Sequence, residues 1–364
     1  MSHSDPNMAS KELKEERDIK WISLNDSSIR LSGFPFYRGE KVLGRIPPEK
    51  KELFEKVNPF INEFGANTAG GQISFRSDTT RVYLRVTTQL VHDMVNMTPA
   101  GQCGFDCYVG KNRQELKFVG VSRFDVRKKS YEIELAQYPT QGKMMEYLIH
   151  FPLYSGVYEV MLGIEGDAKI EKPESFRQQG GLVFYGTSIT QGGCASRPGM
   201  SYTNMLSRKL NMEIYNFGLS ANGLGEYEVA DMLAEIQNPL LYVIDYEANA
   251  GLNGKLQASL KGFIQRIRNH HAVTPILVVS RLPYIRDVLD KAFGERRAEL
   301  RRFQENTVKE LQRQGDENIY FCDGSKLWGE DFDDYTVDTI HPTDLGFYMM
   351  VNNLLPVVKK ILKM

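Results

Sequence analysis

The chain has 364 residues, of which 41% are hydrophobic and 25% are charged, and its formal net charge is −1. This composition is typical of a globular protein, and the length indicates two domains. The balanced charge argues against a basic surface for nucleic acid or an anionic membrane. No apolar run approaches the ~18 residues needed to span a bilayer.

Residues 1–17 are polar and contain neither the apolar core nor the cleavage pattern of a secretion signal. Such a start fits a cytoplasmic protein and also a secreted one whose signal has been removed, so the sequence leaves the compartment open. The oligomeric state is open as well. The four cysteines lack the paired spacing of a zinc or redox motif, and we expect buried free thiols at Cys103, Cys107, Cys194 and Cys322.

The first half of the chain contains short segments in which apolar and polar residues alternate. Residues 81–86, 131–135 and 145–151 have this pattern, and Gly, Asn, Asp and Pro separate them. Alternation with a period of two predicts an antiparallel, jelly-roll-like β-sandwich domain over residues 20–172. A short helix is expected at residues 48–57.

The second half begins after a polar stretch with Pro and Gly, residues 171–181, which we interpret as a linker. Strands are expected at 182–185, 212–217, 240–245, 275–280 and 318–322, and helices at 201–210, 226–236, 255–268, 296–312 and 343–355. This alternation predicts an α/β domain over residues 180–364 whose parallel sheet is covered on both faces. In such sheets the ligand binds at the carboxyl ends of the strands.

Ser188 follows the first of these strands, in the segment Gly186-Thr187-Ser188-Ile189-Thr190. The glycine permits a tight turn. A serine at the start of the next helix lies near backbone N–H groups that favour developing negative charge, which suits a nucleophile. Alone, the same pattern is better explained by an ordinary helix-capping serine. A nucleophilic serine also requires a base.

His341 is the histidine best placed to be that base, because it directly precedes the last helix. The others lie in the polar N-terminal segment, in the β-rich half or at the opposite end of the sheet: His3, His92, His150, His270 and His271. Asp338 precedes His341 by three residues, and a turn of helical character would bring the two side chains together. The carboxylate would then orient the imidazole and stabilise its protonated form.

These segments resemble the SGNH hydrolases of the GDSL lipase and acylhydrolase superfamily. Gly186-Thr187-Ser188-Ile189-Thr190 resembles the first block of that family, with Thr187 in place of its Asp, and Asp338-Thr339-Ile340-His341-Pro342 matches the last block. The blocks stand in the expected order about 150 residues apart. The resemblance covers residues 181–364 and implies a flavodoxin-like α/β/α fold, with Ser188, His341 and Asp338 as catalytic residues.

Two further blocks imply an oxyanion hole. Asn249, after the third strand, corresponds to the family's asparagine that donates its side-chain amide. Ala221, after the second strand, stands where the family usually has glycine. The backbone N–H groups of Ser188 and Ala221 would complete the donor set, and the alanine matters only if its φ is positive.

The β-rich half contains Gly104-Phe105-Asp106-Cys107-Tyr108, which resembles the Gly-x-Asp-Leu-Tyr motif of a β-domain that precedes some SGNH esterases. We expect Asp106 to bind local backbone in a turn. Thr187, and Arg281 at the end of the fourth strand, are candidate substrate-binding residues. The acidic run 330–334 lacks the spacing of a calcium loop, and no metal or cofactor is expected.

The function indicated is a serine esterase that removes a small acyl group, with acetyl on a carbohydrate as the first hypothesis. An acyltransferase that uses the same residues is one alternative. A noncatalytic glycan-binding protein on the same scaffold is another, and the complete set of catalytic residue types argues against it. The expected partner is a small-molecule or carbohydrate ester, with no nucleic acid and no membrane.

Overall fold

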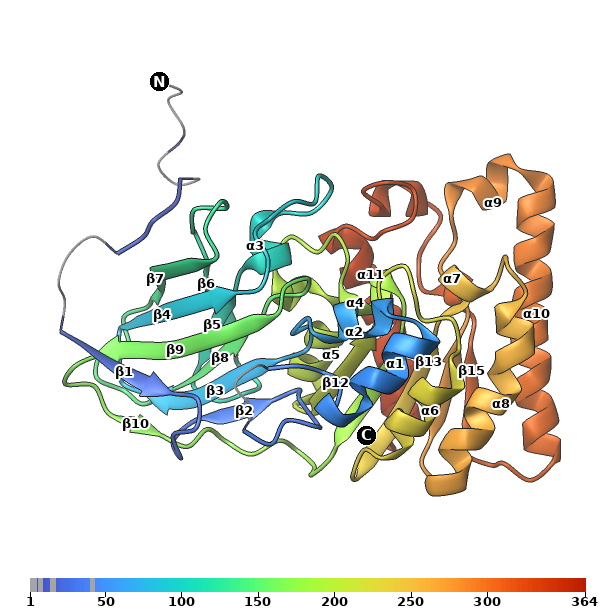
Figure 1. The fold of residues 1–364 in the computed structure, drawn as a ribbon, viewed down its shortest axis with the longest axis horizontal. Helices are drawn as coiled ribbons and strands as arrows, with labels where there is room; N and C mark the ends of the chain where they lie inside the picture. The colour runs from blue at the N-terminus through green and yellow to red at the C-terminus, as the bar shows by residue number, and fades with distance from the viewer. Residues whose placement is uncertain (1–4, 6–8, 14–17, 40–42) are drawn as a thin grey trace.

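The structure is a computed structural model, and it describes residues 5, 9–13, 18–39 and 43–364. Most of the polar segment 1–17 therefore lies outside the described residues. Two β-sheets form the N-terminal region, and a third sheet with helices on both faces forms the C-terminal region (Figure 1). The fold class predicted from the sequence is confirmed.

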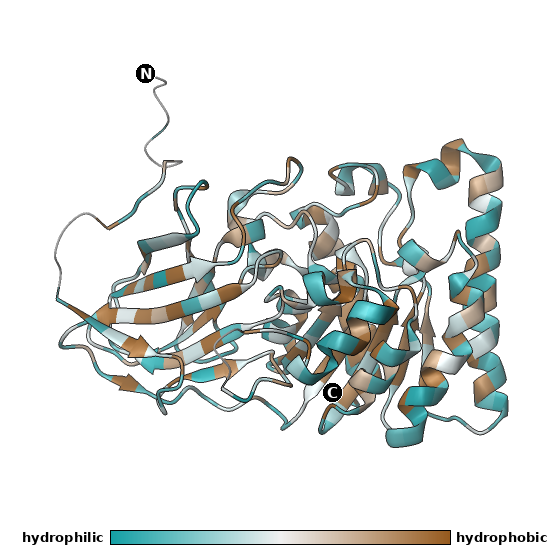
Figure 2. Cartoon of the chain, viewed as in Figure 1, coloured by the Kyte–Doolittle hydropathy of each residue, from teal (hydrophilic) through white to brown (hydrophobic). Residues whose placement is uncertain are grey.

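The N-terminal sheets are antiparallel, as predicted. One has the strand order β1 (Ile19–Ser23), β9 (Val157–Glu165), β4 (Arg81–Thr88), β7 (Ser130–Gln137). The other has the order β10 (Ile170–Glu171), β3 (Gln72–Ser77), β8 (Met145–His150), β5 (Asp106–Gly110), β6 (Lys117–Val121), with β2 (Arg30–Ser32) paired to β3. The strands alternate between hydrophobic and hydrophilic residues (Figure 2), and the apolar side chains of both sheets share one buried cluster.

The C-terminal sheet is parallel and has the order β12 (Glu213–Gly218), β11 (Gly181–Gly186), β13 (Pro239–Asp245), β14 (Ile276–Val279), β15 (Ile319–Cys322). The chain leaves β11 toward β12 on one side and then returns to β13 on the other. This change of direction creates a crevice at the carboxyl end of β11, where ligands bind in open α/β sheets.

Helices cover both faces of this sheet. Leu182 and Phe184 pack against α5 (Tyr202–Leu210) and α11 (Asp344–Ile361), whereas Val183 and Tyr185 pack on the opposite face. That second face carries α6 (Tyr227–Ala234), α8 (Lys255–His270) and α10 (Lys291–Arg313). Shorter helices connect the layers: α4 (Ser188–Gln191), η2 (Pro198–Met200), α7 (Glu247–Ala250), α9 (Ile285–Leu289), η3 (Gly324–Lys326) and η4 (Phe332–Tyr335).

The N-terminal region also contains helices that the alternating pattern did not reveal. The predicted helix at 48–57 is η1 (Pro48–Lys50) followed by α1 (Lys51–Val57), and α2 (Phe60–Gly65) and α3 (Pro99–Cys103) are additional. Phe54 of α1 and Ile61 of α2 are fully buried in the same cluster as the α6 face of the C-terminal sheet. Figure 1 accordingly shows α1 and α2 lying against the C-terminal region. The two regions therefore share part of their core.

Candidate active site

Ser188 lies at the crevice beyond the carboxyl end of β11. Thr187 is the N-cap of the one-turn helix α4, and its hydroxyl accepts a hydrogen bond from the N–H of Ile189 at 3.4 Å. Gly186 must be small, because a Cβ there would lie 2.4 Å from the carbonyl oxygen of Asp245. Ser188 is 8% exposed, so the residue is nearly buried at this edge of the sheet.

The Ser188 hydroxyl is hydrogen-bonded to His341, with 2.8 Å between Oγ and Nε2. On the other side of the ring, Nδ1 of His341 lies 2.8 Å from Oδ2 of Asp338. A serine, an imidazole and a carboxylate joined in this order can transfer the serine proton to the imidazole while the carboxylate holds the ring in place.

The turn that carries Asp338 and His341 differs from the helical turn that we expected. Thr339 has a φ of +72°, and the turn is closed by a hydrogen bond of 2.8 Å from the N–H of Val337 to the carbonyl of His341. Oδ1 of Asp338 accepts the backbone N–H groups of Ile340 and His341. The carboxylate, rather than helical geometry, therefore organises this turn.

Asp338 is also held in its ionised form. Burial raises the pKa of its carboxyl, but the hydrogen bonds from the backbone and side chain of His341 outweigh this effect, so the pKa lies below its ordinary value. An ionised Asp338 stabilises a positive charge on His341 during proton transfer.

The predicted oxyanion donors lie on two neighbouring loops. Ala221 follows β12 and has a φ of +55°, which explains why glycine is the usual residue of the family at this position. Asn249 lies in α7, and one N–H of its side chain donates to the carbonyl of Asn222. Because an amide nitrogen carries two hydrogens, the second one can still donate to an oxyanion.

Thr187 and Arg281, the candidate substrate-binding residues, have buried side chains. Arg281 is 5% exposed and pairs with Asp287 at 2.6 Å. The backbone N–H of Arg281 also donates to Glu247, the first residue of α7, at 2.8 Å. The position of Arg281 therefore supports the helix that carries Asn249.

The N-terminal region reaches the site at three places that no sequence motif marks. The hydroxyl of Tyr154 donates to the carbonyl of Ser188 at 3.3 Å. The amide of Asn58 donates to Oδ1 of Asn222 at 2.6 Å. The amide of Asn96 donates to Oδ2 of Asp338 at 2.8 Å. Only the folded structure reveals these contacts, since each joins residues far apart in the sequence.

Asp106 is fully buried, and our expectation that it binds local backbone is wrong. Its Oδ1 lies 2.8 Å from Nδ1 of His150, and its Oδ2 accepts bonds from Arg197 at 2.7 Å and from the N–H of Gly199 at 2.8 Å. Arg197 and Gly199 belong to the segment that follows α4. The motif therefore connects the β-rich region to the neighbourhood of Ser188.

Among the residues that the structure describes, one group of side chains could hold a metal ion. The ligand atoms of Cys194, Asp338 and His341 lie within 4.8 Å of one another. Burial and the nearby Asp338 raise the pKa of the Cys194 thiol to about 12. In the structure His341 and Asp338 bind each other, and His341 also binds Ser188, so a metal here would compete with those hydrogen bonds. All four cysteines are buried free thiols, as predicted.

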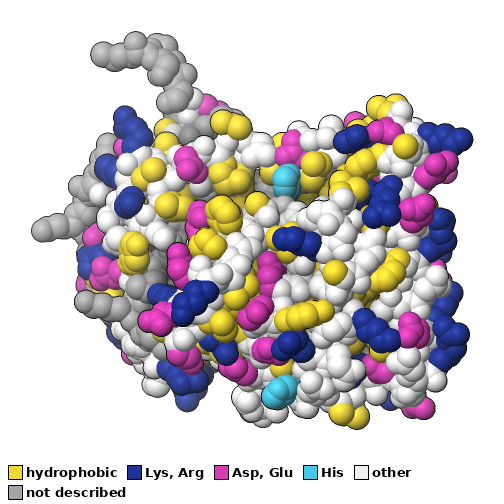
Figure 3. Space-filling view, turned by 45° about the vertical axis from the view of Figure 1, so that its right-hand side comes forward, with side chains coloured by type: hydrophobic (Ala, Val, Ile, Leu, Met, Phe, Trp, Pro, Cys, Tyr) yellow, Lys and Arg dark blue, Asp and Glu magenta, His cyan; other side chains and the backbone are white. Residues whose placement is uncertain are grey.

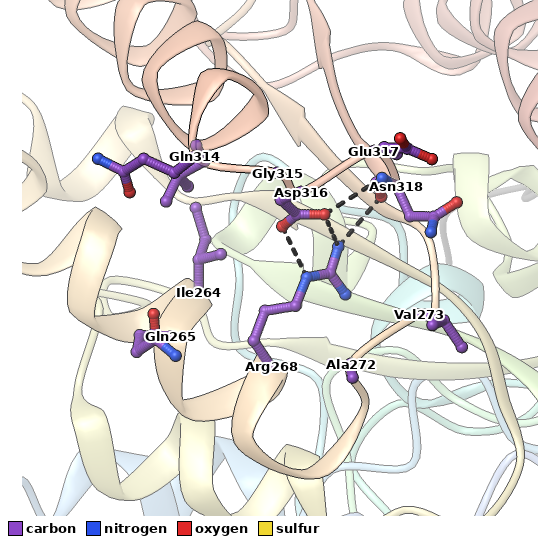
Figure 4. A pocket seen from close by; sticks show the side chains of 11 residues that line it. Ile264, Gln265, Arg268, Ala272, Val273, Gln314, Gly315, Asp316, Glu317 and Asn318 are labelled. Atoms are coloured by element: carbon purple, nitrogen blue, oxygen red, sulfur yellow. Dashed lines mark hydrogen bonds and ion pairs between the residues drawn. The ribbon is translucent and has the colours of Figure 1, made fainter.

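A cavity of about 460 Å³ lies elsewhere, between the ends of α8 and α10 (Figure 4). Its polar centre is Arg268, which pairs with Asp316 at 2.7 Å and donates to the carbonyl of Asn318 at 3.1 Å. The cavity lies beside the amino ends of β14 and β15, opposite the edge that carries Ser188. We therefore assign it no part in the candidate site.

Acidic and basic side chains are interspersed on the face drawn in Figure 3, in keeping with the net charge of −1. No helix in the described part of the chain combines the length and the apolar character that crossing a membrane requires.

A parallel sheet that places a serine, a histidine and an aspartate in hydrogen-bond contact at its carboxyl edge belongs to the α/β class of hydrolase folds. Comparison with protein families identifies residues 179–359 as a GDSL-like lipase/acylhydrolase domain and residues 19–170 as the GxDLY N-terminus of SGNH-hydrolase-type esterases. The chain belongs to these SGNH esterases of the GDSL-like family.

Solved structures with the same fold cover nearly the whole chain. A protein described as a GDSL-like lipase from Bacteroides ovatus is 29% identical, has a TM-score of 0.84, and aligns over 95% of this chain and 98% of its own. The salicylyl-acyltransferase SsfX3 from a tetracycline biosynthetic pathway is 19% identical, with a TM-score of 0.74 and coverage of 94% and 99%. A family two carbohydrate esterase from Cellvibrio japonicus is 13% identical, with a TM-score of 0.60 and coverage of 95% and 98%. The search of curated proteins found no match.

Proposed function

We propose that the chain is a serine esterase that hydrolyses small acyl esters, with acetyl esters of carbohydrates as its substrate class. The observation that carries the proposal is the unbroken series of hydrogen bonds from Ser188 through His341 to Asp338, each 2.8 Å long. The structural similarity to a carbohydrate esterase supports the choice of substrate class.

In the proposed reaction, Oγ of Ser188 attacks the ester carbonyl carbon while its proton passes to Nε2 of His341. The backbone N–H groups of Ser188 and Ala221 and the amide of Asn249 bind the oxyanion that forms. The alcohol then leaves with the proton from His341. Water, deprotonated by the same imidazole, attacks the acyl group on Ser188 and releases the acid.

The test is turnover on a panel of p-nitrophenyl esters of increasing chain length, beside acetylated oligosaccharides. Hydrolysis should be fastest for the shortest acyl chains, and Ser188→Ala should lower kcat by about 10⁴-fold or more while leaving the fold intact. A fluorophosphonate probe should label the wild type and not the variant. Equal labelling of both would place the nucleophile elsewhere.

Acyl transfer to an alcohol passes through the same acyl-enzyme, and the similarity to an acyltransferase makes it the second candidate. Product analysis with and without an added alcohol separates the two reactions. Free acid as the main product in both cases supports hydrolysis, whereas a new ester that replaces the acid supports transfer. Binding of acetylated oligosaccharide without turnover would instead indicate a noncatalytic glycan-binding protein.

A further inference from the structure

The loop 89–98 leaves β4 of the N-terminal region and meets the turn that carries Asp338. At their contact, Nδ2 of Asn96 donates to Oδ2 of Asp338 at 2.8 Å. We propose that Asn96 is a positioning residue of the active site, whose hydrogen bond holds Asp338 in the orientation that His341 requires. This inference rests on the proposed function, since it assigns Asn96 a part in the same proton transfer.

The first argument is the set of donors around the Asp338 carboxylate. Oδ1 accepts the backbone N–H groups of Ile340 at 3.2 Å and His341 at 2.8 Å. Oδ2 accepts Nδ1 of His341 and the amide of Asn96, each at 2.8 Å. Four donors match the four lone-pair positions of a carboxylate, so the group is saturated.

The origin of those donors distinguishes Asn96 from the rest. The other three belong to residues 340 and 341, which lie in the same turn and move with Asp338. Asn96 alone among these four donors belongs to a separate part of the fold. Thr339 in this turn has a left-handed backbone, and the Asp338 side chain is 31% exposed, so the turn alone leaves the carboxylate free to reorient. A hydrogen bond from outside the turn reduces the number of orientations that Asp338 can adopt.

The second argument is that the loop is itself fixed. Gln102 of α3 accepts the N–H groups of Asp93 at 3.1 Å and Met94 at 3.2 Å. Nε2 of His92 lies 2.9 Å from the carbonyl oxygen of Met97. The hydroxyl of Thr98 donates to the carbonyl of Ser196 in the C-terminal region. Hydrogen bonds therefore fix the loop both before and after Asn96 in the sequence, as a positioning group requires.

The expected effect is moderate. Asp338 is partly exposed, so water can replace a lost amide and the carboxylate remains hydrated. What is lost is the orientation, and we expect Asn96→Ala to lower kcat by about tenfold on a small soluble ester with KM little changed. We expect kcat to fall and KM to stay nearly constant because Asn96 contacts Asp338 and does not contact the ester.

Asn96→Asp separates a hydrogen-bond role from a packing role. Aspartate has the same shape as asparagine, but at about pH 8 it is an acceptor and repels Asp338. If Asn96 acts as a donor, Asn96→Asp should lose at least as much kcat as Asn96→Ala. Asn112→Ala is the matched control. It removes a similar hydrogen bond, from the side-chain amide of Asn112 to Oε1 of Glu115 at 2.9 Å, in an exposed turn after β5. It should keep wild-type kcat.

A second readout needs no substrate. In protein labelled with ¹⁵N-histidine, the low-field proton on Nδ1 of His341 reports the bond to Asp338, and His341→Gln assigns it. Both Asn96 variants should shift this resonance upfield and speed its exchange with water, and Asn112→Ala should leave it unchanged. Activity of Asn96→Asp above that of Asn96→Ala, or an unchanged resonance in both, would overturn the proposal. Absence of esterase activity in the wild type would reject the proposed function, and the resonance would still decide the role of Asn96.

Discussion

Asp106, which is fully buried, joins the two regions of the chain through an ion pair with the partly buried Arg197, with 2.7 Å between Oδ2 and Nη1. The same oxygen accepts the N–H of Gly199, and a Cβ at Gly199 would lie 2.6 Å from it, so only glycine permits the contact. The segment fixed in this way follows α4 and includes Gly193, which packs against His341. The motif around Asp106 thus acts on the candidate active site through the segment between α4 and α5.

The first prediction concerns the free energy of unfolding. Asp106→Ala leaves Arg197, Arg208 and His150 around an empty position, and we expect it to destabilise the protein by about 3–5 kcal/mol in urea unfolding. Asp125→Ala is the control, because it removes a carboxylate that pairs with the exposed Arg127 in a surface turn, and it should destabilise the protein much less than Asp106→Ala. Equal midpoints for the two variants would show that Asp106 does not hold the regions together.

The second prediction is a loss of stability in acid that depends on His150. Its Nδ1 faces Asp106, and its Nε2 faces Arg208 at 3.2 Å, which fits a neutral ring that donates to one and accepts from the other. Burial and the two nearby arginines lower the pKa of His150 to about 4, although Asp106 opposes this shift. Burial raises the pKa of Asp106, but His150 and the two arginines outweigh it, so that pKa is lowered as well.

The sign follows from proton binding. Between about pH 6.5, the ordinary pKa of histidine, and about pH 4, the unfolded chain binds a proton at His150 that the folded protein does not bind. The free energy of unfolding should therefore fall as the pH is lowered through this window. Asp106 adds to the loss at lower pH for the same reason.

Urea titrations across this pH range provide the test. His150→Asn keeps a donor near the position of Nδ1 and removes the titrating ring, so its stability should depend less on pH than that of the wild type. Parallel pH profiles for the two proteins would contradict the assignment. The neighbouring ionisable groups that face His150 are unchanged in the variant, namely Asp106, Tyr108, Arg197 and Arg208.

The strand and helix periods predict Ser188 after the first strand of the parallel sheet and Asp338 and His341 just before the last helix, and the structure joins these three side chains by hydrogen bonds. Their catalytic roles come from the family resemblance and belong to the proposed function. The sequence did not place Asp106 correctly, since the partners of that carboxylate lie 44, 91 and 93 residues later in the chain. Hydrophobic periodicity indicates which face of an element is buried, but it does not indicate which other element covers that face.

The same limit applies to the helices of the N-terminal region. The pattern around Phe54 and Ile61 predicts the apolar residues of short amphipathic helices. The neighbouring sequence does not indicate that these two side chains enter the core beside the C-terminal sheet. The backbone at Ala221 was partly foreseeable, because the family glycine raised the question of a positive φ, but only the structure gives the value of +55°.

The third prediction follows from that backbone angle. Ala221→Gly removes the steric cost of a Cβ in the left-handed region and should raise the free energy of unfolding by up to about 1 kcal/mol. Activity should stay the same, because the N–H donor is retained. Ala298→Gly in the interior of α10 is the control of opposite sign and should cost about 1 kcal/mol. A loss of stability in both variants would argue against strain at Ala221.

The fourth prediction concerns Gly193, beside the histidine. A Cβ at this position would lie 2.8 Å from the hydroxyl of Tyr154 and 3.3 Å from Cδ2 of His341. Gly193→Ala should displace the imidazole and lower kcat by about tenfold, which corresponds to about 1.4 kcal/mol. Tyr154→Phe removes the closest atom, and the double variant should recover part of the loss. Gly329→Ala, where the nearest atom is 3.8 Å from the added carbon, is the control and should be fully active.

The last prediction concerns a protein that begins near Gly180 and lacks the N-terminal region. Arg45, buried in that region, donates to the carbonyls of Asn216 at 2.7 Å and Gly218 at 2.9 Å, so its loss leaves two buried acceptors of β12 without this partner.

The apolar face that Phe54 and Ile61 cover would become exposed in the same truncated protein. The contacts of Asn58 and Asn96 with Asn222 and Asp338 would also be absent. We therefore expect aggregation or loss of activity even on small soluble esters, which need no binding to a distant glycan.

A full-length protein with a protease site inserted in the linker at 173–179 provides the control, because both regions fold together before the cut. After cleavage the two fragments should remain associated in size-exclusion chromatography and keep their activity, since the contacts of Arg45, Phe54 and Ile61 with the C-terminal region lie outside the linker. A well-folded truncated protein with full activity on small esters would show instead that the N-terminal region serves only as a tether. Dissociation of the cleaved fragments with activity retained in the C-terminal one would lead to the same conclusion by an independent route.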